Sequence, residues 1–182
     1  MEATKTYVAL LRGINVGGKN KIAMAELQSL FSSLGFEDVV TYIQSGNVVF
    51  RTARADVGAL SGKIEREIAA VFGIKPAVLL RTPKELATIA ERNPYPSRDV
   101  DLSKLHVVFL DDAPAKRAAA ALDPERSPGD EFTLRGREIY LHLPNGAGRS
   151  KLTIDYFERV LGARATQRNW KTLLRLIELS RD

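Results

Sequence analysis

The sequence has 182 residues, a formal net charge of +5 at pH 7, an isoelectric point of about 9.6 and no cysteine. The missing cysteine excludes disulfides, thiolate nucleophiles and thiolate metal sites, and it is typical of a reducing compartment. No stretch approaches the roughly 18 apolar residues of a membrane span and no secretory signal is recognisable, so we expect a cytoplasmic protein with no membrane partner.

The first part of the chain has a strand-rich pattern interrupted by two helical ones. Short apolar or β-branched runs predict strands at 6–11, 39–44, 47–52 and 74–80. Apolar residues at helical spacing predict helices at 24–34 and 57–71, and a glycine follows each of them. Ser45-Gly46 separates the second and third strands and predicts a tight hairpin. The element order is therefore βαββαβ.

A helix at 83–92 and a Pro-rich linker at 93–99 come next, and the same order then returns. The strands of the second part are expected at 105–110, 131–134, 138–143 and 164–167. Its helices are expected at 114–122, 150–161 and 169–180. Ser150 and Asn169 are placed to be N-caps, Gly162 to end the middle helix, and Trp170 to lie in the core.

Two successive βαββαβ units predict an α+β fold, a tandem pair of ferredoxin-like halves with extra helices, formed by duplication. We expect a first half at 1–82, a helix and linker at 83–103, and a second half with a C-terminal helix at 104–182. In such a half we expect the loops after the first and third strands to lie at one end of the sheet. The loop 144–151 would then be the counterpart of 12–21, and the hairpin at 44–46 would lie at the opposite end.

The positive charge is concentrated at the two ends of the sequence. Residues 1–21 have a net charge of +3 and residues 149–182 a net charge of +4, whereas the middle has −2. This distribution suggests the hypothesis that 12–21 and 149–171 approach each other and bind an anion together. The alternative is that these are ordinary solvated side chains.

The segment from Gly13 to Lys19 fits G-x-x-x-x-G-K, the pattern of a phosphate-binding loop. Asn20 stands where magnesium binding needs Ser or Thr, and the helical pattern starts only at Met24. A nucleotide triphosphatase is therefore disfavoured, even though Asp111 follows an apolar strand as in such enzymes. Lys19 serving another anion and a purely structural turn both remain open.

A second polar group surrounds two predicted helix starts. Arg149, Ser150 and Lys151 follow a Gly-rich turn, and Arg168 and Asn169 precede the last helix. Free N–H groups at helix starts, with cations beside them, form anion pockets. The simpler interpretation of each of these two segments is a capped helix that follows a turn, with no ligand.

Other sites are weaker. His106 and His142 fall on strands that would be neighbours, but no carboxylate accompanies them at a ligand spacing, so no metal is predicted. The element order also suggests an RNA-recognition module, but Asn47 and Val49 stand where that module needs aromatic residues, so it is rejected.

Four motifs of the chain resemble those of the bacterial domain-of-unknown-function family 1697. They are Leu10-Leu-Arg-Gly-Ile-Asn-Val-Gly-Gly-Lys-Asn20, Thr41-Tyr-Ile-Gln-Ser-Gly-Asn-Val-Val-Phe50, Gly148-Arg-Ser-Lys-Leu-Thr153 and Thr166-Gln-Arg-Asn-Trp170. The resemblance spans nearly the whole chain and implies a two-part α+β fold. It brings no activity, and it marks the polar loops named above as shared.

Three functions are compatible with these residues. The first is a binding module for an anionic ligand: a nucleotide, a phosphorylated metabolite or a nucleic-acid backbone. The others are an enzyme acting on a phosphorylated or carboxylate substrate and an interaction protein. The binding residues expected for the first are Arg12, Asn15, Gly17, Gly18, Lys19, Asn20, Arg149, Ser150, Lys151, Arg168 and Asn169. Whether the protein is an enzyme, its cofactor and its oligomeric state do not follow from the sequence.

Overall fold

A computed structural model describes residues 3–53, 56–95 and 99–181. The chain forms two compact units, Met1–Ala87 with Leu176–Asp182 (unit 1) and Thr88–Arg175 (unit 2). The boundary between the units falls inside two helices. The predicted linker lies partly outside the described residues, at 96–98.

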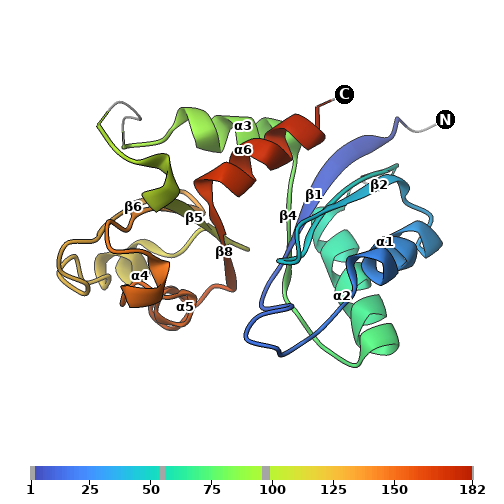
Figure 1. The fold of residues 1–182 in the computed structure, drawn as a ribbon, viewed down its shortest axis with the longest axis horizontal. Helices are drawn as coiled ribbons and strands as arrows, with labels where there is room; N and C mark the ends of the chain where they lie inside the picture. Colours follow the sequence, from blue (N-terminus) through green and yellow to red (C-terminus); the bar gives the residue numbers. More distant parts are fainter. Residues whose placement is uncertain (1–2, 54–55, 96–98, 182) are drawn as a thin grey trace. The chain divides into compact units, whose positions relative to one another are not determined.

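Both units alternate strands and helices in the predicted order (Figure 1). The elements up to the first boundary are β1 (Lys5–Leu11), α1 (Met24–Ser33), β2 (Glu37–Tyr42), β3 (Asn47–Thr52), α2 (Val57–Phe72), β4 (Val78–Arg81) and α3 (Pro83–Glu91). The later elements are β5 (Leu105–Leu110), α4 (Lys116–Ala120), β6 (Glu131–Arg135), β7 (Glu138–His142), α5 (Ile154–Leu161), β8 (Ala165–Asn169) and α6 (Trp170–Leu179). Two 3₁₀ turns, Leu102–Lys104 and Ala147–Arg149, complete the description.

Each unit contains one four-stranded antiparallel sheet, and the two sheets have the same strand order. It is β2-β3-β1-β4 in unit 1 and β6-β7-β5-β8 in unit 2. The register of the fourth strand is also the same: Leu11 pairs with Val78 as Leu110 pairs with Ala165. The expectation of two similar α+β halves is confirmed at this level.

The expected placement of the loops is wrong, and strand direction is the reason. β1 is antiparallel to β3, so Leu10 at the end of β1 pairs with Asn47 at the start of β3. The 43–46 hairpin therefore lies at the same end of the sheet as the loop after β1. In unit 2 the counterpart of the loop after β1 is the segment after β5. The loop 144–151 follows β7, which ends beside the start of β5, so this loop begins at the opposite end of the unit 2 sheet.

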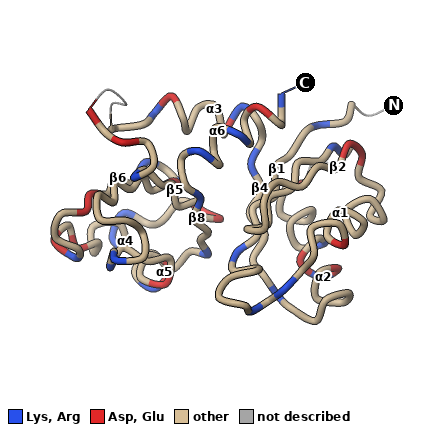
Figure 2. The backbone as a smooth tube through the Cα atoms, viewed as in Figure 1, with Lys and Arg blue, Asp and Glu red and all other residues tan. Residues whose placement is uncertain are grey.

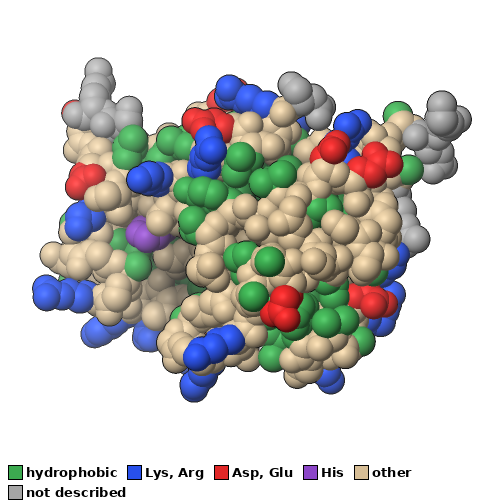
Figure 3. Space-filling view, turned by 45° about the vertical axis from the view of Figure 1, so that its right-hand side comes forward, with side chains coloured by type: hydrophobic (Ala, Val, Ile, Leu, Met, Phe, Trp, Pro, Cys, Tyr) green, Lys and Arg blue, Asp and Glu red, His purple; other side chains and the backbone are tan. Residues whose placement is uncertain are grey.

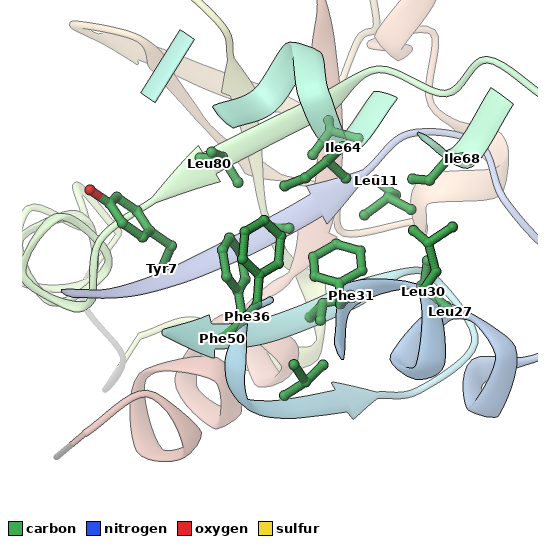
Figure 4. Packing of buried hydrophobic residues seen from close by; sticks show 14 of the residues in the cluster. Tyr7, Leu11, Leu27, Leu30, Phe31, Phe36, Phe50, Ile64, Ile68 and Leu80 are labelled. Atoms are coloured by element: carbon green, nitrogen blue, oxygen red, sulfur yellow. The ribbon is translucent and has the colours of Figure 1, made fainter. Parts of the chain in front are cut away.

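The core of unit 1 lies between its sheet and the helices α1 and α2 (Figure 4). Alternate residues of β1 and β3 face these helices, which contribute apolar side chains at three- and four-residue spacing. At its centre the Phe36 and Phe50 rings lie 4.6 Å apart, and Phe31 meets Phe50 edge-on at 5.3 Å. Tyr7 also belongs to this core and is 3% exposed.

Unit 2 has its own core between its sheet and α5, with Phe157 fully buried. Trp170, at the start of α6, is 5% exposed, which confirms its expected burial. One cap differs from the expectation: α5 begins at Ile154, and Thr153 rather than Ser150 is its N-cap, accepting from Tyr156 N at 3.2 Å. Gly162 ends α5 in the left-handed conformation, and Asn169 caps α6 by accepting from Thr172 N, both as predicted.

Within the described ranges, none of the helices has the length and apolar character that crossing a bilayer requires.

Candidate functional site

Three connections of unit 1 meet at one end of its sheet. They are 12–23 after β1, 43–46 between β2 and β3, and 73–77 before β4. Backbone hydrogen bonds join them: Leu11 N donates to Gly46 O, and Arg12 N donates to Ala77 O, both at 2.9 Å. The sequence motifs that begin at Leu10 and at Thr41 therefore belong to one structural feature.

The Gly-rich part of the first connection is a tight two-residue turn. Lys19 N donates to Val16 O at 3.0 Å, and the intervening Gly17 and Gly18 have φ of +57° and +75°. Two successive positive φ values are typical of a type I′ turn, which favours glycine at both positions. The two glycines thus have a structural role, and they hold Val16 and Lys19 opposite each other.

Asn15 fastens this turn to the neighbouring hairpin. Its Nδ2 donates to Ile22 O at 2.9 Å and to Gln44 O at 2.8 Å, and its Oδ1 accepts from Ile22 N at 2.9 Å. Asn20 Nδ2 donates to Gly13 O at 3.0 Å. Both asparagines adopt positive φ, which Asn tolerates better than most residues. These contacts position the loop, so the predicted Asn15 and Asn20 are positioning residues here.

Gly46 brings the hairpin close to the first connection. It has φ of +83°, and an added Cβ would lie 2.6 Å from Ile14 Cδ1 and 2.9 Å from Leu11 Cβ. Only glycine satisfies both conditions without a shift of the backbone. This contact packs the hairpin directly on buried Ile14.

The three connections contain four cationic residues, Arg12, Lys19, Lys21 and Lys75, and no acidic residue. We call this part of unit 1 the basic end. Figure 2 shows Lys and Arg but no Asp or Glu along the loop after β1, and Figure 3 shows how Lys and Arg side chains project outward from the surface. Lys19, Lys21 and Lys75 are exposed, and no described residue forms an ion pair with them. The nearest acid along the chain is Glu26, in the first turn of α1.

The corresponding end of unit 2 has a different charge pattern. There Asp111 follows β5, and its carboxylate accepts from Arg164 N and Nε, both at 2.9 Å. In unit 2 this ion pair adds to a backbone bond from Asp111 N to Arg164 O, at 2.9 Å, which corresponds to the Arg12–Ala77 bond of unit 1. Asp111 is thereby engaged structurally rather than placed for metal binding. Of the two equivalent ends, the acid-free one belongs to unit 1.

The structure does not form a nucleotide triphosphatase loop around Lys19. In such loops the helix begins at the lysine, whereas α1 begins at Met24, and the sheet is antiparallel throughout. The segment that matches G-x-x-x-x-G-K is therefore a β-turn. A structural turn was one of the two interpretations that the sequence left open.

The second predicted group lies in unit 2. Arg149 and Lys151 are exposed, Lys151 N donates to Ser127 Oγ at 3.1 Å, and Ser150 Oγ accepts from Leu152 N at 3.0 Å. Ser150 thus stabilises the turn before α5. That the two predicted groups form a joint site stays a prediction, because they belong to different units.

Arg168 is buried, with 6% of its surface exposed. Its guanidinium donates to Thr166 Oγ1 and to Gln167 O, both at 2.8 Å, so the side chain folds back on its own strand. Loss of hydration lowers its pKa to about 10. Arg81 has the same place in unit 1: it pairs with Val8 as Arg168 pairs with Val107, and it is also buried.

The two histidines lie on opposite faces of their sheet. Their strands are neighbours, as predicted, but Leu105 pairs with His142 and His106 with Leu141, so alternation separates the imidazoles. Within the described residues, no group of three or more His, Cys, Asp or Glu side chains could hold a metal. Burial lowers the pKa of His106.

Sequence reasoning missed Lys75 and the contribution of the hairpin. Both could have been found from strand direction, because antiparallel pairing places the end of the first strand beside the starts of the third and fourth strands. Lys21 lay within the predicted segment but was not among the predicted binding residues.

Comparison with known proteins supports the fold. The structure is similar to that of the conserved bacterial protein SP0830 from Streptococcus pneumoniae, with a TM-score of 0.75, 24% sequence identity, and coverage of 98% of this chain and 100% of that one. No curated protein matches the sequence. The model of the family described as "Protein of unknown function (DUF1697)" matches residues 4–140, and the chain therefore belongs to this family.

Proposed function

We propose that the protein binds a phosphate-bearing anion at the basic end of unit 1. One observation carries this proposal: three connections held together by hydrogen bonds bear four cations and no acid. Like charges gathered on one small surface repel one another, and a bound anion relieves that repulsion. The Asn15 contacts keep the loop in place before a ligand arrives, which reduces the entropy lost on binding.

Binding is favoured over catalysis because of the residue types present. The three connections contain no His, Asp or Glu, the residues that most often act as general acids and bases. The enzyme alternative would have to use the lysines as electrostatic stabilisers alone. The second predicted group, at 149–151 and 168–169, stays a prediction for unit 2.

The test compares a triple variant, Lys19→Ala with Lys21→Ala and Lys75→Ala, with a control that removes three exposed lysines elsewhere, Lys5→Ala with Lys84→Ala and Lys116→Ala. Both variants lose the same charge, so a difference between them is local. Binding of fluorescent ATP, polyphosphate and short single-stranded RNA is measured by anisotropy. We expect the first variant to lose binding and the control to keep it. Equal binding by both variants, or none by the unaltered protein, would refute the proposal.

Salt dependence then reports how many phosphates are contacted. If the protein contacts three or four phosphates of a single-stranded polyanion, its affinity should fall roughly 20- to 50-fold between about 50 and 200 mM salt. The affinity for a mononucleotide should fall less than about 5-fold over the same range.

We further propose that each unit is a ferredoxin-like domain, an idea supported by the shared strand order and helix positions. Failure of either unit to superpose all four strands and both helices on such domains would contradict it.

A further inference from the structure

Two aliphatic side chains are exposed at the tips of the basic end. Val16, in the Gly-rich turn, is 62% exposed, and Ile43, in the hairpin, is 46% exposed. The bond from Asn15 Nδ2 to Gln44 O, at 2.8 Å, joins the residues next to them in the chain. The two tips are therefore neighbours, and an apolar pair lies among the cations.

The backbone at Ile43 is strained. Its φ is +47°, in the left-handed region that β-branched residues rarely adopt. Asparagine or glycine would fit this position better, and the half-exposed side chain contributes little packing in return. Strain that the fold does not need is often found at functional positions. Ile43 is thus a candidate for contact with a partner.

The surroundings of this apolar pair decide which partner fits. Lys19 pairs with Val16 across the turn and Lys21 follows two residues later, so a second copy of the same surface would be repelled. Valine and isoleucine have no aromatic face on which nucleic-acid bases could stack. Aliphatic tips with lysines around them match the boundary of an anionic bilayer, where apolar groups enter the acyl region and cations meet the headgroup phosphates.

We propose that the basic end docks reversibly on an anionic membrane surface, with Val16 and Ile43 entering the interface. This inference rests on the proposed function, because the headgroup phosphate is the anion that the lysines bind. The sequence analysis predicts no membrane partner because no segment could span a bilayer. The proposal departs from that prediction, since a surface contact needs no span. A small patch of this kind gives weak, salt-sensitive binding, since its charges are screened over about 8 Å at physiological salt.

The experiment is co-sedimentation of the purified full chain with vesicles of phosphatidylglycerol and phosphatidylcholine, compared with phosphatidylcholine alone. The apolar variant is Val16→Ser with Ile43→Asn, which keeps the lysines and suits the backbone at position 43. Its matched control, Val57→Ser with Val71→Ser, removes two exposed valines of α2. The Lys19, Lys21 and Lys75 triple variant completes the set, and binding of polyphosphate is measured in parallel. Circular dichroism checks that each variant is folded.

We expect the unaltered protein to bind only the anionic vesicles. The triple lysine variant should bind them about 100-fold more weakly, at roughly fivefold per lysine. The apolar variant should bind them about 10-fold more weakly and keep its polyphosphate binding, and the control should lose neither.

Three results would overturn the inference, and they separate it from the proposed function. Unchanged vesicle binding by the apolar variant would show that the aliphatic tips do not enter the interface. Binding to polyphosphate or RNA but not to vesicles would leave the proposed function standing and exclude the membrane. Binding to none of these ligands would refute both.

Discussion

Gly46 is the residue whose replacement the structure tolerates least at the basic end. The substitution Gly46→Ala should destabilise the protein by about 2–4 kcal/mol, because the new Cβ combines a positive φ with contacts of 2.6 and 2.9 Å to Ile14. Gly17→Ala is the matched control: it has a positive φ but nothing within 4 Å, so it should cost only about 1 kcal/mol. Urea unfolding of both variants checks this, and equal losses would contradict the packing argument.

Ile43 gives the opposite expectation for stability. Replacing it with asparagine should stabilise the fold by about 1 kcal/mol, because the left-handed conformation costs a β-branched residue about that much. The measurement is the unfolding midpoint against that of the unaltered protein. A loss of stability would mean that the Ile43 side chain contributes more packing than its 46% exposure indicates.

His106 should make stability depend on pH. Burial lowers its pKa in the folded state, so folding favours the neutral imidazole. Below the unfolded value of about 6.5 the unfolded chain binds the proton more readily, and stability therefore falls as the pH decreases from there. The variant His106→Gln should lose part of this dependence in urea titrations between about pH 7 and 5, whereas His142→Gln serves as the comparison. Identical pH profiles for unaltered protein and His106→Gln would exclude the effect.

At the level of single elements, α3 begins with a capping box. Thr82 Oγ1 accepts from Glu85 N at 3.2 Å, while Glu85 Oε2 accepts from Thr82 N at 2.7 Å. Thr82→Ala should therefore cost about 1 kcal/mol, and Thr82→Ser, which keeps the acceptor, much less. Thermal unfolding of the two variants makes the comparison. Equal midpoints would show that this cap adds nothing to the stability.

Most elements were predictable because their patterns are local. β3 and β5 occur with the predicted bounds, 47–52 and 105–110, since each is a run of β-branched and aromatic residues between turn signals. The start of α5 was misplaced because Ser150 and Thr153 are both good caps, and only packing decides between them. Ile43 departs furthest from local preference, with a φ of +47° that β-branched residues rarely adopt, and no sequence signal marks this.

The candidate site was predictable only in part, because its residues come together through strand pairing. The Gly-rich turn was recognisable from its own sequence, but its contact with Gln44 depends on the direction of β3 relative to β1. Arg168 shows a second limit. A helix entry with a basic residue suggests a ligand, whereas the side chain is 6% exposed and bonded to its own strand.

At the scale of the whole molecule, the limits of unit 2 can be tested with fragments. Segment 88–95 contacts the unit 2 sheet: Tyr140 Oη donates to Ile89 O at 2.7 Å, Arg135 donates to Arg92 O at 2.6 Å, and Tyr95 Oη lies 3.3 Å from Thr133 Oγ1. A fragment 88–175 should therefore be more stable than 104–175 by about 3 kcal/mol, at roughly 1 kcal/mol for each hydrogen bond. Equal stability in urea would instead favour the predicted division, with 83–103 as helix and linker.

The burial of Trp170 has a spectroscopic consequence. It is the single tryptophan of the chain and lies in unit 2, so fluorescence excited selectively at tryptophan, and not at the tyrosines, follows the surroundings of this one residue of unit 2. Far-ultraviolet circular dichroism, by contrast, averages over the helices of both units. Coincident transitions by the two methods would mean that the units melt as one cooperative block, and separated ones that each has its own midpoint. The native sequence thus allows the cooperativity of the molecule to be measured without any label.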